Sequence, residues 1–195
     1  MFDITLYGHL AIDKIQDGNK ITMNFGGMAN MVRTFQDIGA DISLGLSPLV
    51  LGEANIYINR EDSTRDSVAD LNRVAYDSPI RESHISHILY INRLDNTDFI
   101  PNLTGIVTAD TCKGHKVDLQ LLKYVDYLFM SYEEMYDIEE LIEHTKGSVI
   151  IHSAVSSVIH NKKDKKVYFI DPSLYVKDAY VLGAGDMFAS CFLYE

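Results

Sequence analysis

Short apolar segments alternate with helical patterns along this chain, and this alternation limits the folds it can adopt. Several segments have the length and apolar content of ordinary β-strands, and helical patterns separate some of them. The segments are residues 3–10, 41–46, 54–58, 87–92, 105–109, 124–130, 148–151 and 166–170. The alternation predicts an α/β fold with a mostly parallel central sheet that helices cover on both faces.

Three segments before residue 145 have helical patterns. The first, Ala29–Ile38, follows paired glycines and ends at Gly39, a residue typical of helix C-termini. The second covers residues 117–124. The third covers residues 132–144, and its predicted N-cap is Ser131, with acidic residues in the first turn where the helix dipole favours them.

Length and composition indicate one compact domain. The chain has 195 residues, of which 47% are hydrophobic, and no Pro/Gly-rich linker divides it. We therefore expect a single domain over residues 1–195. Residues 14–24, around a turn at Asp17-Gly18-Asn19, are predicted to form a small lid.

Charge and hydropathy argue against several classes of partner. With 28 acidic and 17 basic residues the formal net charge is −11, and the densest basic run, residues 162–166, has the pattern of a hairpin tip. Nucleic-acid binding is therefore not expected. No apolar run has the length of a membrane span and residues 1–10 lack a signal-peptide pattern, so we expect a cytoplasmic protein with no membrane partner. Cys112 and Cys191 are predicted to be buried small side chains.

The most informative motif is Gly183-Ala184-Gly185-Asp186, which precedes an apolar helical segment. Glycines around one alanine allow a tight turn whose N–H groups point the same way, and a helix N-terminus favours a phosphate at that place. Asp186 in the first turn could accept a proton from an attacking hydroxyl. A plain tight turn capped by Asp186 is the alternative interpretation of these four residues.

The motif and the residues after it resemble the C-terminal signature of the ribokinase-like (PfkB) carbohydrate kinase family. Phe25-Gly26-Gly27-Met28-Ala29-Asn30 is similar to the Gly-Gly segment and helix-starting Asn near the N-terminus of that family. The resemblance implies a three-layer α/β/α sandwich with a reduced β lid. It also implies that Gly183, Ala184 and Gly185 form an anion hole and that Asp186 is the catalytic base.

Weaker similarities lie elsewhere in the chain. Asp13 resembles the family Asp that, with Gly26, Gly27 and Asn30, binds substrate hydroxyls. Ser131 and Glu134 stand where the family has an Asn-x-x-Glu motif near magnesium and the phosphates, which implies that Glu134 organises the metal through water. Asp110 stands where members often have an Asp before a Pro-Asn pair. Ser153 falls in the segment beside the nucleotide.

The sequence departs from the family pattern in four places. Tyr180-Val181-Leu182 replaces an Asp-Thr-Thr-like run, and residues 152–157 lack the glycines of the nucleotide segment. The Gly-Gly segment is one residue shorter than usual before Asn30. Few residues follow Asp186, so the resemblance is to a compact or truncated member with a weakened nucleotide site.

The resemblance implies ATP-dependent transfer of the γ-phosphoryl group to a primary hydroxyl of a small sugar or nucleoside, with ATP and Mg²⁺ as cofactors. The alternative is a degenerate member that binds a ligand or partner without catalysis. A further alternative is an unrelated nucleotide-binding domain with a chance Gly-Ala-Gly-Asp. An exposed lid strand would favour a homodimer.

Other polar residues have structural explanations that compete with functional ones. His84 and His87 have a spacing that would suit two metal ligands on a helix, but their surroundings are equally typical of a strand. His9 and His152 follow strands, where a structural role is the simpler interpretation. The mixed-charge stretch from Arg60 to Asp70 is interpreted as a surface turn rather than a flap over a substrate.

Overall fold

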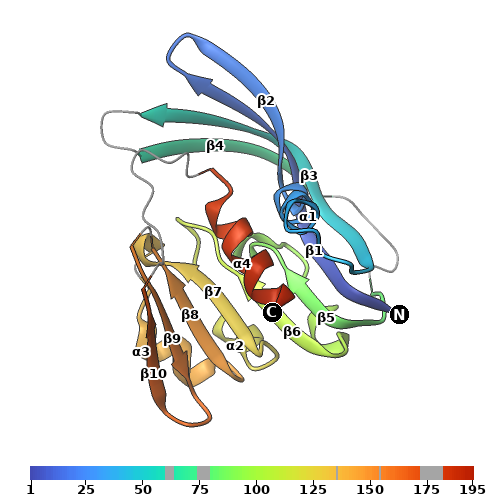
Figure 1. Ribbon diagram of the computed structural model, residues 1–195, viewed down its shortest axis with the longest axis vertical. Helices are drawn as coiled ribbons and strands as arrows, with labels where there is room; N and C mark the ends of the chain where they lie inside the picture. The colour runs from blue at the N-terminus through green and yellow to red at the C-terminus, as the bar shows by residue number, and fades with distance from the viewer. Residues whose placement is uncertain (60–63, 74–79, 135, 154, 172–181) are drawn as a thin grey trace. The chain divides into compact units, whose positions relative to one another are not determined.

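A computed structural model describes residues 1–59, 64–73, 80–134, 136–153, 155–171 and 182–195 of the chain, which form two compact units (Figure 1). Strands β1 (Phe2–Asp17) and β3 (Leu44–Asn59) begin in unit 1 and end in unit 2. The single domain over residues 1–195 stays a prediction. Unit 1 holds the described residues of Met1–Tyr7, Asp41–Ser47 and Ser78–Val176, and unit 2 those of Gly8–Ala40, Pro48–Asp77 and Lys177–Glu195.

Unit 1 contains a sheet whose central strands are parallel, as the sequence predicts. The hydrogen-bonded order is β10-β9-β8-β7-β6-β5-β1, and the pairs from β8 to β1 are parallel whereas β8, β9 and β10 are antiparallel. These strands are β5 (Ser83–Ile88), β6 (Ile106–Asp110), β7 (Tyr127–Ser131), β8 (Ser148–His152), β9 (Ser157–Asn161) and β10 (Lys166–Ile170).

The core of unit 1 lies on these parallel strands. Leu128 and Phe129 of β7 and Val149 and Ile150 of β8 are buried in succession, so each strand is apolar on both faces. The helical elements are η1 (Ile91–Arg93), η2 (Ile100–Asn102), α2 (Leu119–Leu122), η3 (Tyr132–Glu134) and α3 (Ile138–His144). Of these, α3 packs against both α2 and β8.

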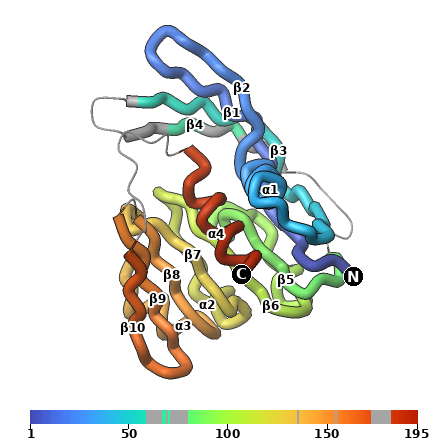
Figure 2. Tube along the Cα trace, in the orientation of Figure 1, coloured from blue at the N-terminus to red at the C-terminus, as the bar shows by residue number. Residues whose placement is uncertain are grey.

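The described part of unit 2 consists of two antiparallel strand pairs and two helices. The second half of β1 pairs with β2 (Lys20–Gly27) through a turn at Gly18, as predicted, and β3 pairs with β4 (Thr64–Arg73). Helix α1 (Met28–Asp37) packs against α4 (Ala184–Tyr194). Met31 and Phe35 of α1 and Ala189 of α4 are buried. Figure 2 traces these segments along the chain.

The helix predicted over residues 132–144 is interrupted. Glu134 ends the short η3, and α3 begins only after Asp137, whose side chain caps it by accepting from the Glu140 N–H at 3.2 Å. Ser131 is therefore the last residue of β7 and not the N-cap of a long helix. Its N–H donates to the Glu134 carboxylate, which folds the chain back locally. The helix predicted over 117–124 is likewise short: it begins after Asp118, whose side chain caps it by accepting from the Gln120 N–H, and it ends at Leu122.

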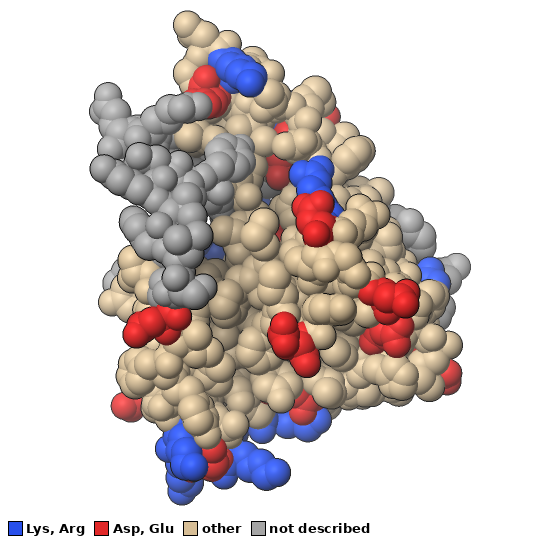
Figure 3. Space-filling view, viewed as in Figure 1, with Lys and Arg blue, Asp and Glu red and all other residues tan. Residues whose placement is uncertain are grey.

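Strand boundaries also differ from those predicted. Residues 41–46 and 54–58 were expected in two strands, but one strand, β3, covers the second half of the first segment and all of the second. Asp66 and Asp70 lie in β4 rather than in a surface turn, since an edge strand tolerates charged side chains; Arg60 and Asp62 lie outside the described residues. The basic hairpin tip is confirmed, because residues 162–165 join β9 to β10. Figure 3 shows Lys and Arg side chains gathered at the lower end of the view, where Figure 1 draws this hairpin.

The two cysteines are more exposed than the sequence predicts. Cys191 is exposed and Cys112 is only half-buried, so the prediction that both thiols are buried was wrong. Cys191 lies on α4, on the side of the helix away from Ala189 and Ser190. Among the described residues no helix has both the length and the apolar character that a membrane crossing requires.

Candidate active site

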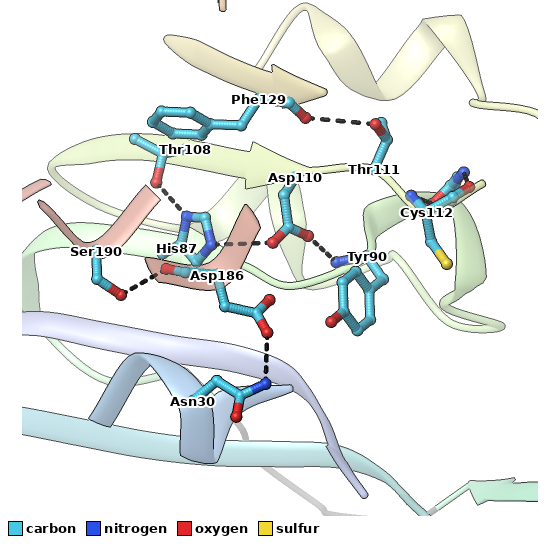
Figure 4. A network of polar contacts seen from close by, with 11 residues as sticks. Asn30, His87, Tyr90, Thr108, Asp110, Thr111, Cys112, Phe129, Asp186 and Ser190 are labelled. Carbon is cyan, nitrogen blue, oxygen red and sulfur yellow. Dashed lines mark hydrogen bonds and ion pairs between the residues drawn. The ribbon is translucent and has the colours of Figure 1, made fainter. Parts of the chain in front are cut away.

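Asp186 lies in the first turn of α4 and is buried, with 4% of its surface exposed. The side-chain amide of Asn30, on α1, donates to Asp186 Oδ2 at 2.7 Å (Figure 4). The Ser190 hydroxyl, one turn further along α4, donates to the Asp186 carbonyl at 2.7 Å. The two signature segments, far apart in the sequence, thus meet at this carboxylate within unit 2.

The turn before α4 has the backbone geometry that the motif predicts. Gly183 has φ 78° and is the N-cap of α4, and the first intrahelical bond runs from the Met187 N–H to the Gly183 carbonyl. The N–H groups of Ala184 and Gly185 precede that bond and point along the helix axis, where the positive end of the helix dipole favours an anion. This geometry is compatible with an anion hole formed by Gly183, Ala184 and Gly185, which stays a prediction.

The paired glycines lie where no side chain fits. A Cβ on Gly26 would stand 2.1 Å from Asp13 Oδ2, so the Asp13 carboxylate lies directly against the Gly26 backbone. Gly27 has φ 59°, and a Cβ there would stand 2.6 Å from the His9 carbonyl oxygen. Asp13 is itself buried in β1. Unit 2 therefore brings Asp13 against Gly26, and Asn30 against Asp186.

Glu134, the predicted metal organiser, lies in unit 1 just beyond the carboxyl end of β7. Its carboxylate accepts hydrogen bonds from the Thr111 hydroxyl and, at 3.1 Å, from the Ser131 N–H. Burial raises the pKa of Glu134; these two hydrogen bonds act in the opposite direction, and the nearby Asp110 carboxylate adds to the rise. Ser131 and Glu134, the two residues that match the family's Asn-x-x-Glu motif, thus contact each other, with the backbone N–H of Ser131 as the donor.

Ser153, assigned to the nucleotide side, is used by its own hairpin. Its N–H and its hydroxyl both donate to the Ser156 carbonyl, and its hydroxyl oxygen accepts from the N–H groups of Val155 and Ser156. These bonds close the connection between β8 and β9. Its predicted contact with a nucleotide stays a prediction, and a hydroxyl engaged in this way has little capacity left for a ligand.

Unit 1 contains a buried polar network that the sequence does not predict. His87 Nδ1 lies 2.8 Å from the Thr108 hydroxyl, and His87 Nε2 lies 3.6 Å from the Asp110 carboxylate. That carboxylate also accepts a hydrogen bond from the N–H of Tyr90, which has the left-handed values φ 56° and ψ 56° (Figure 4). Because β5 is a strand, His84 and His87 point to opposite faces and cannot share a metal ion.

The raised pKa of Glu134 makes a testable prediction about stability. Between the ordinary pKa and the raised one, the folded chain holds more protons than the unfolded chain, so the stability contributed by Glu134 falls as pH rises. Relative to Glu134→Gln, we expect the unfolding free energy of the wild type to increase as pH is lowered from neutral toward the ordinary pKa of a glutamate. Urea unfolding at several pH values measures the difference, and a pH-independent difference would contradict the prediction.

Comparisons with known proteins identify the fold. Neither a scan against family models nor a search of curated proteins found a match. Among solved structures, the chain is similar to ribokinase from Thermotoga maritima, with 18% identity and a TM-score of 0.73 over 98% of this chain and 84% of that one. It is also similar to a pyrophosphate-dependent kinase in the ribokinase family, complexed with a pyrophosphate analogue and myo-inositol.

That second likeness has 17% identity and a TM-score of 0.66 over 97% of this chain and 86% of that one. A third similar structure is a fructokinase double mutant from Vibrio cholerae with fructose, ADP and potassium ion bound. It has 16% identity and a TM-score of 0.64, over 98% of this chain and 83% of that one. The protein therefore has the ribokinase-like α/β fold, which confirms the fold class expected from the sequence.

Proposed function

We propose that this protein is a carbohydrate kinase that transfers the γ-phosphoryl group of ATP to a primary hydroxyl of a small sugar or nucleoside in the cytoplasm. The observation that carries the proposal is the buried Asp186 carboxylate, fixed by Asn30 at the start of α4. The fold supports it, because the structures to which the chain is similar are kinases that include ribokinase and fructokinase.

The predicted residues of unit 2 each have a role in this proposal. Asp186 would take the proton as the substrate oxygen forms its bond to the γ-phosphorus and the bond to the β–γ bridging oxygen breaks, leaving ADP. The amides of Gly183, Ala184 and Gly185 would stabilise charge on the transferred group. The buried carboxylate of Asp13, the segment Gly26-Gly27 and Asn30 would hold the substrate hydroxyls.

The Glu134 carboxylate fits a water-mediated role toward Mg²⁺. It offers oxygen ligands, which Mg²⁺ prefers, but both oxygens already accept hydrogen bonds from Thr111 and Ser131. Water bound to the ion could still donate to their remaining lone pairs. When bound, the ion would neutralise phosphate charge. Glu134 would orient that water shell, and Ser131 and Thr111 would fix the carboxylate.

A degenerate protein that binds without catalysis is the second candidate. The observation that favours it is Ser153, whose hydroxyl is used within the β8–β9 hairpin, in a segment without the glycines of the nucleotide-binding pattern. Because this segment is poorly suited to bind a nucleoside, the phosphoryl donor could be a molecule without one. Inorganic pyrophosphate is therefore included beside ATP, since one similar structure is a pyrophosphate-dependent kinase.

The deciding assay supplies Mg²⁺ with ATP or pyrophosphate to a panel of pentoses, hexoses and nucleosides. Acceptor-dependent release of ADP, with formation of the phosphorylated acceptor, is the expected result. Hydrolysis of ATP or pyrophosphate without an acceptor is measured as the background rate. No turnover with any acceptor, together with ligand-induced thermal stabilisation, would support the binding protein instead.

We also propose that the protein forms a homodimer through the lid hairpin of β1 and β2. Ile21, Met23 and Phe25 alternate along β2, so they share one face, and each is between 57% and 69% exposed. Among the described strands, β2 pairs only with β1, which leaves its other edge open. A second copy of the same hairpin would cover both the apolar face and the edge.

Met23→Glu is expected to convert this dimer to a monomer, because it places a charge in the buried centre of the apolar face. Thr22→Glu puts the same charge on the opposite face of β2, where Thr22 is also exposed, and should leave the dimer intact. Sedimentation velocity at micromolar concentration distinguishes the two states. A wild-type monomer, or equal effects of both variants, would refute the interface.

A further inference from the structure

Asn92 connects three segments of unit 1. It lies in η1, the turn after β5. Its side-chain nitrogen lies within hydrogen-bond distance of three oxygens, which share its two N–H donors: the carbonyls of Cys112 at 2.8 Å and His115 at 3.0 Å, and the Tyr136 hydroxyl at 2.8 Å. Its Oδ1 accepts from the Cys112 N–H at 2.9 Å. One amide therefore links η1 to the connections that follow β6 and η3, and uses both its donors and its acceptor.

Asn92 binds two segments that flank Glu134: one carries Thr111, which contacts the Glu134 carboxylate, and the other follows Glu134 in the sequence. Cys112 directly follows Thr111, whose hydroxyl donates to Glu134. Tyr136 lies two residues beyond Glu134, and its own hydroxyl donates to the His115 carbonyl. Burial raises the pKa of Tyr136 to about 12, so this hydroxyl stays protonated and keeps donating at neutral pH.

The turn that carries Asn92 is itself fixed. Tyr90 adopts a left-handed conformation, which is strained for a residue with a side chain, and the Asp110 carboxylate stabilises it by accepting the Tyr90 N–H (Figure 4). Asp110 ends β6, and Thr111 follows it. The carboxyl ends of β5 and β6 are thus joined twice, at Asp110 and at Asn92.

We propose that Asn92 is a positioning residue that fixes the Glu134 carboxylate by binding the segments of Thr111 and Tyr136 together. The role of Glu134 toward Mg²⁺ rests on the proposed function, but the positioning itself does not. An aspartate in place of Asn92 could accept from Cys112 but could donate to none of the three oxygens. Asparagine is therefore required for its donated bonds.

Amide hydrogen exchange of the full chain tests the proposal without any assay of activity. The Ser131 N–H donates to Glu134 and is not touched by Asn92, so its exchange reports how firmly the carboxylate is held. In Asn92→Ala we expect exchange at both Cys112 and Ser131 to accelerate about five- to tenfold, as the loss of a hydrogen bond implies. Faster exchange at Cys112 with unchanged exchange at Ser131 would overturn the proposal.

Two further variants separate positioning from general loosening. Asn92→Asp should keep the Cys112 N–H protected from exchange but not the Ser131 N–H. If Asn92→Ala does not fold, this variant alone decides whether Asn92 positions Glu134. Asn102→Ala is the control. It removes an η2 side-chain amide that donates to the Asp98 carbonyl at 3.4 Å, and it should change the exchange rate of neither Cys112 nor Ser131. Loss of protection at both sites in Asn102→Ala would show that the effect is general and would refute the proposal.

If the chain is active, Asn92→Ala should raise the Mg²⁺ concentration needed for half-maximal rate about five- to tenfold and leave KM for the acceptor unchanged. A rise in acceptor KM alone would contradict this role. If the wild type shows no activity, the proposed function fails, while the exchange experiment still decides whether Asn92 positions Glu134.

Discussion

Asp186→Asn should reduce kcat for the phosphorylated acceptor by about 10²- to 10⁴-fold, the usual contribution of a general base. Asparagine has the same shape and its carbonyl oxygen can still accept from the Asn30 amide, which now bonds Asp186 at 2.7 Å. The variant should therefore keep the start of α4 and lose only the ability to take a proton. Initial rates at saturating ATP and acceptor measure the effect.

Asp37→Asn provides a matched control for that substitution. Asp37 is the last residue of α1, in the same unit, and is exposed, so its change should alter the rate less than about twofold. Thermal unfolding of both variants checks that the fold is retained. If Asp186→Asn retained more than about a third of the wild-type kcat, Asp186 would not be the base, and its bond to Asn30 would be structural.

The parallel strands of unit 1 could be predicted because burial on both faces leaves a local signal. In β7 and β8 the buried residues are consecutive, and a continuous apolar run of this length is visible in the sequence. The ends of the strands could not be predicted in the same way. Tyr90 turns into the left-handed region next to the end of β5, and the group that stabilises it, Asp110, lies twenty residues further on.

In the candidate site, too, the residues with a local sequence signal could be predicted and the others could not. The Gly-Gly and Gly-Ala-Gly-Asp segments were found because backbone conformation and close approach require glycine there, which leaves a mark in the sequence. Ser131 and Glu134 were found by their resemblance to the family's Asn-x-x-Glu motif, which did not show that the backbone N–H of Ser131 donates to Glu134. Asn92 was not found, because nothing near it in sequence shows that its amide reaches Cys112 and Tyr136.

Gly27→Ala is expected to destabilise unit 2 by about 3 kcal/mol, the upper part of the range for a strained backbone. Gly27 has φ 59° and ψ −121°, values that residues with a Cβ scarcely adopt. The added methyl group would also meet the His9 carbonyl oxygen at 2.6 Å, and backbone atoms cannot move aside as a side chain can. Urea unfolding measures the loss.

Gly39→Ala separates these two causes at the other end of the same helix. Gly39 also has a positive φ, 69°, but a Cβ there would meet nothing within 4 Å, so only the conformational cost of about 1 to 2 kcal/mol should appear. Equal losses in the two variants would show that Gly27 is not held against His9. Because Gly27 is the N-cap of α1, relief of the clash would displace the turn that carries Asn30 and with it the amide that fixes Asp186. Gly27→Ala should consequently lose activity at temperatures where it is still folded, whereas Gly39→Ala should not.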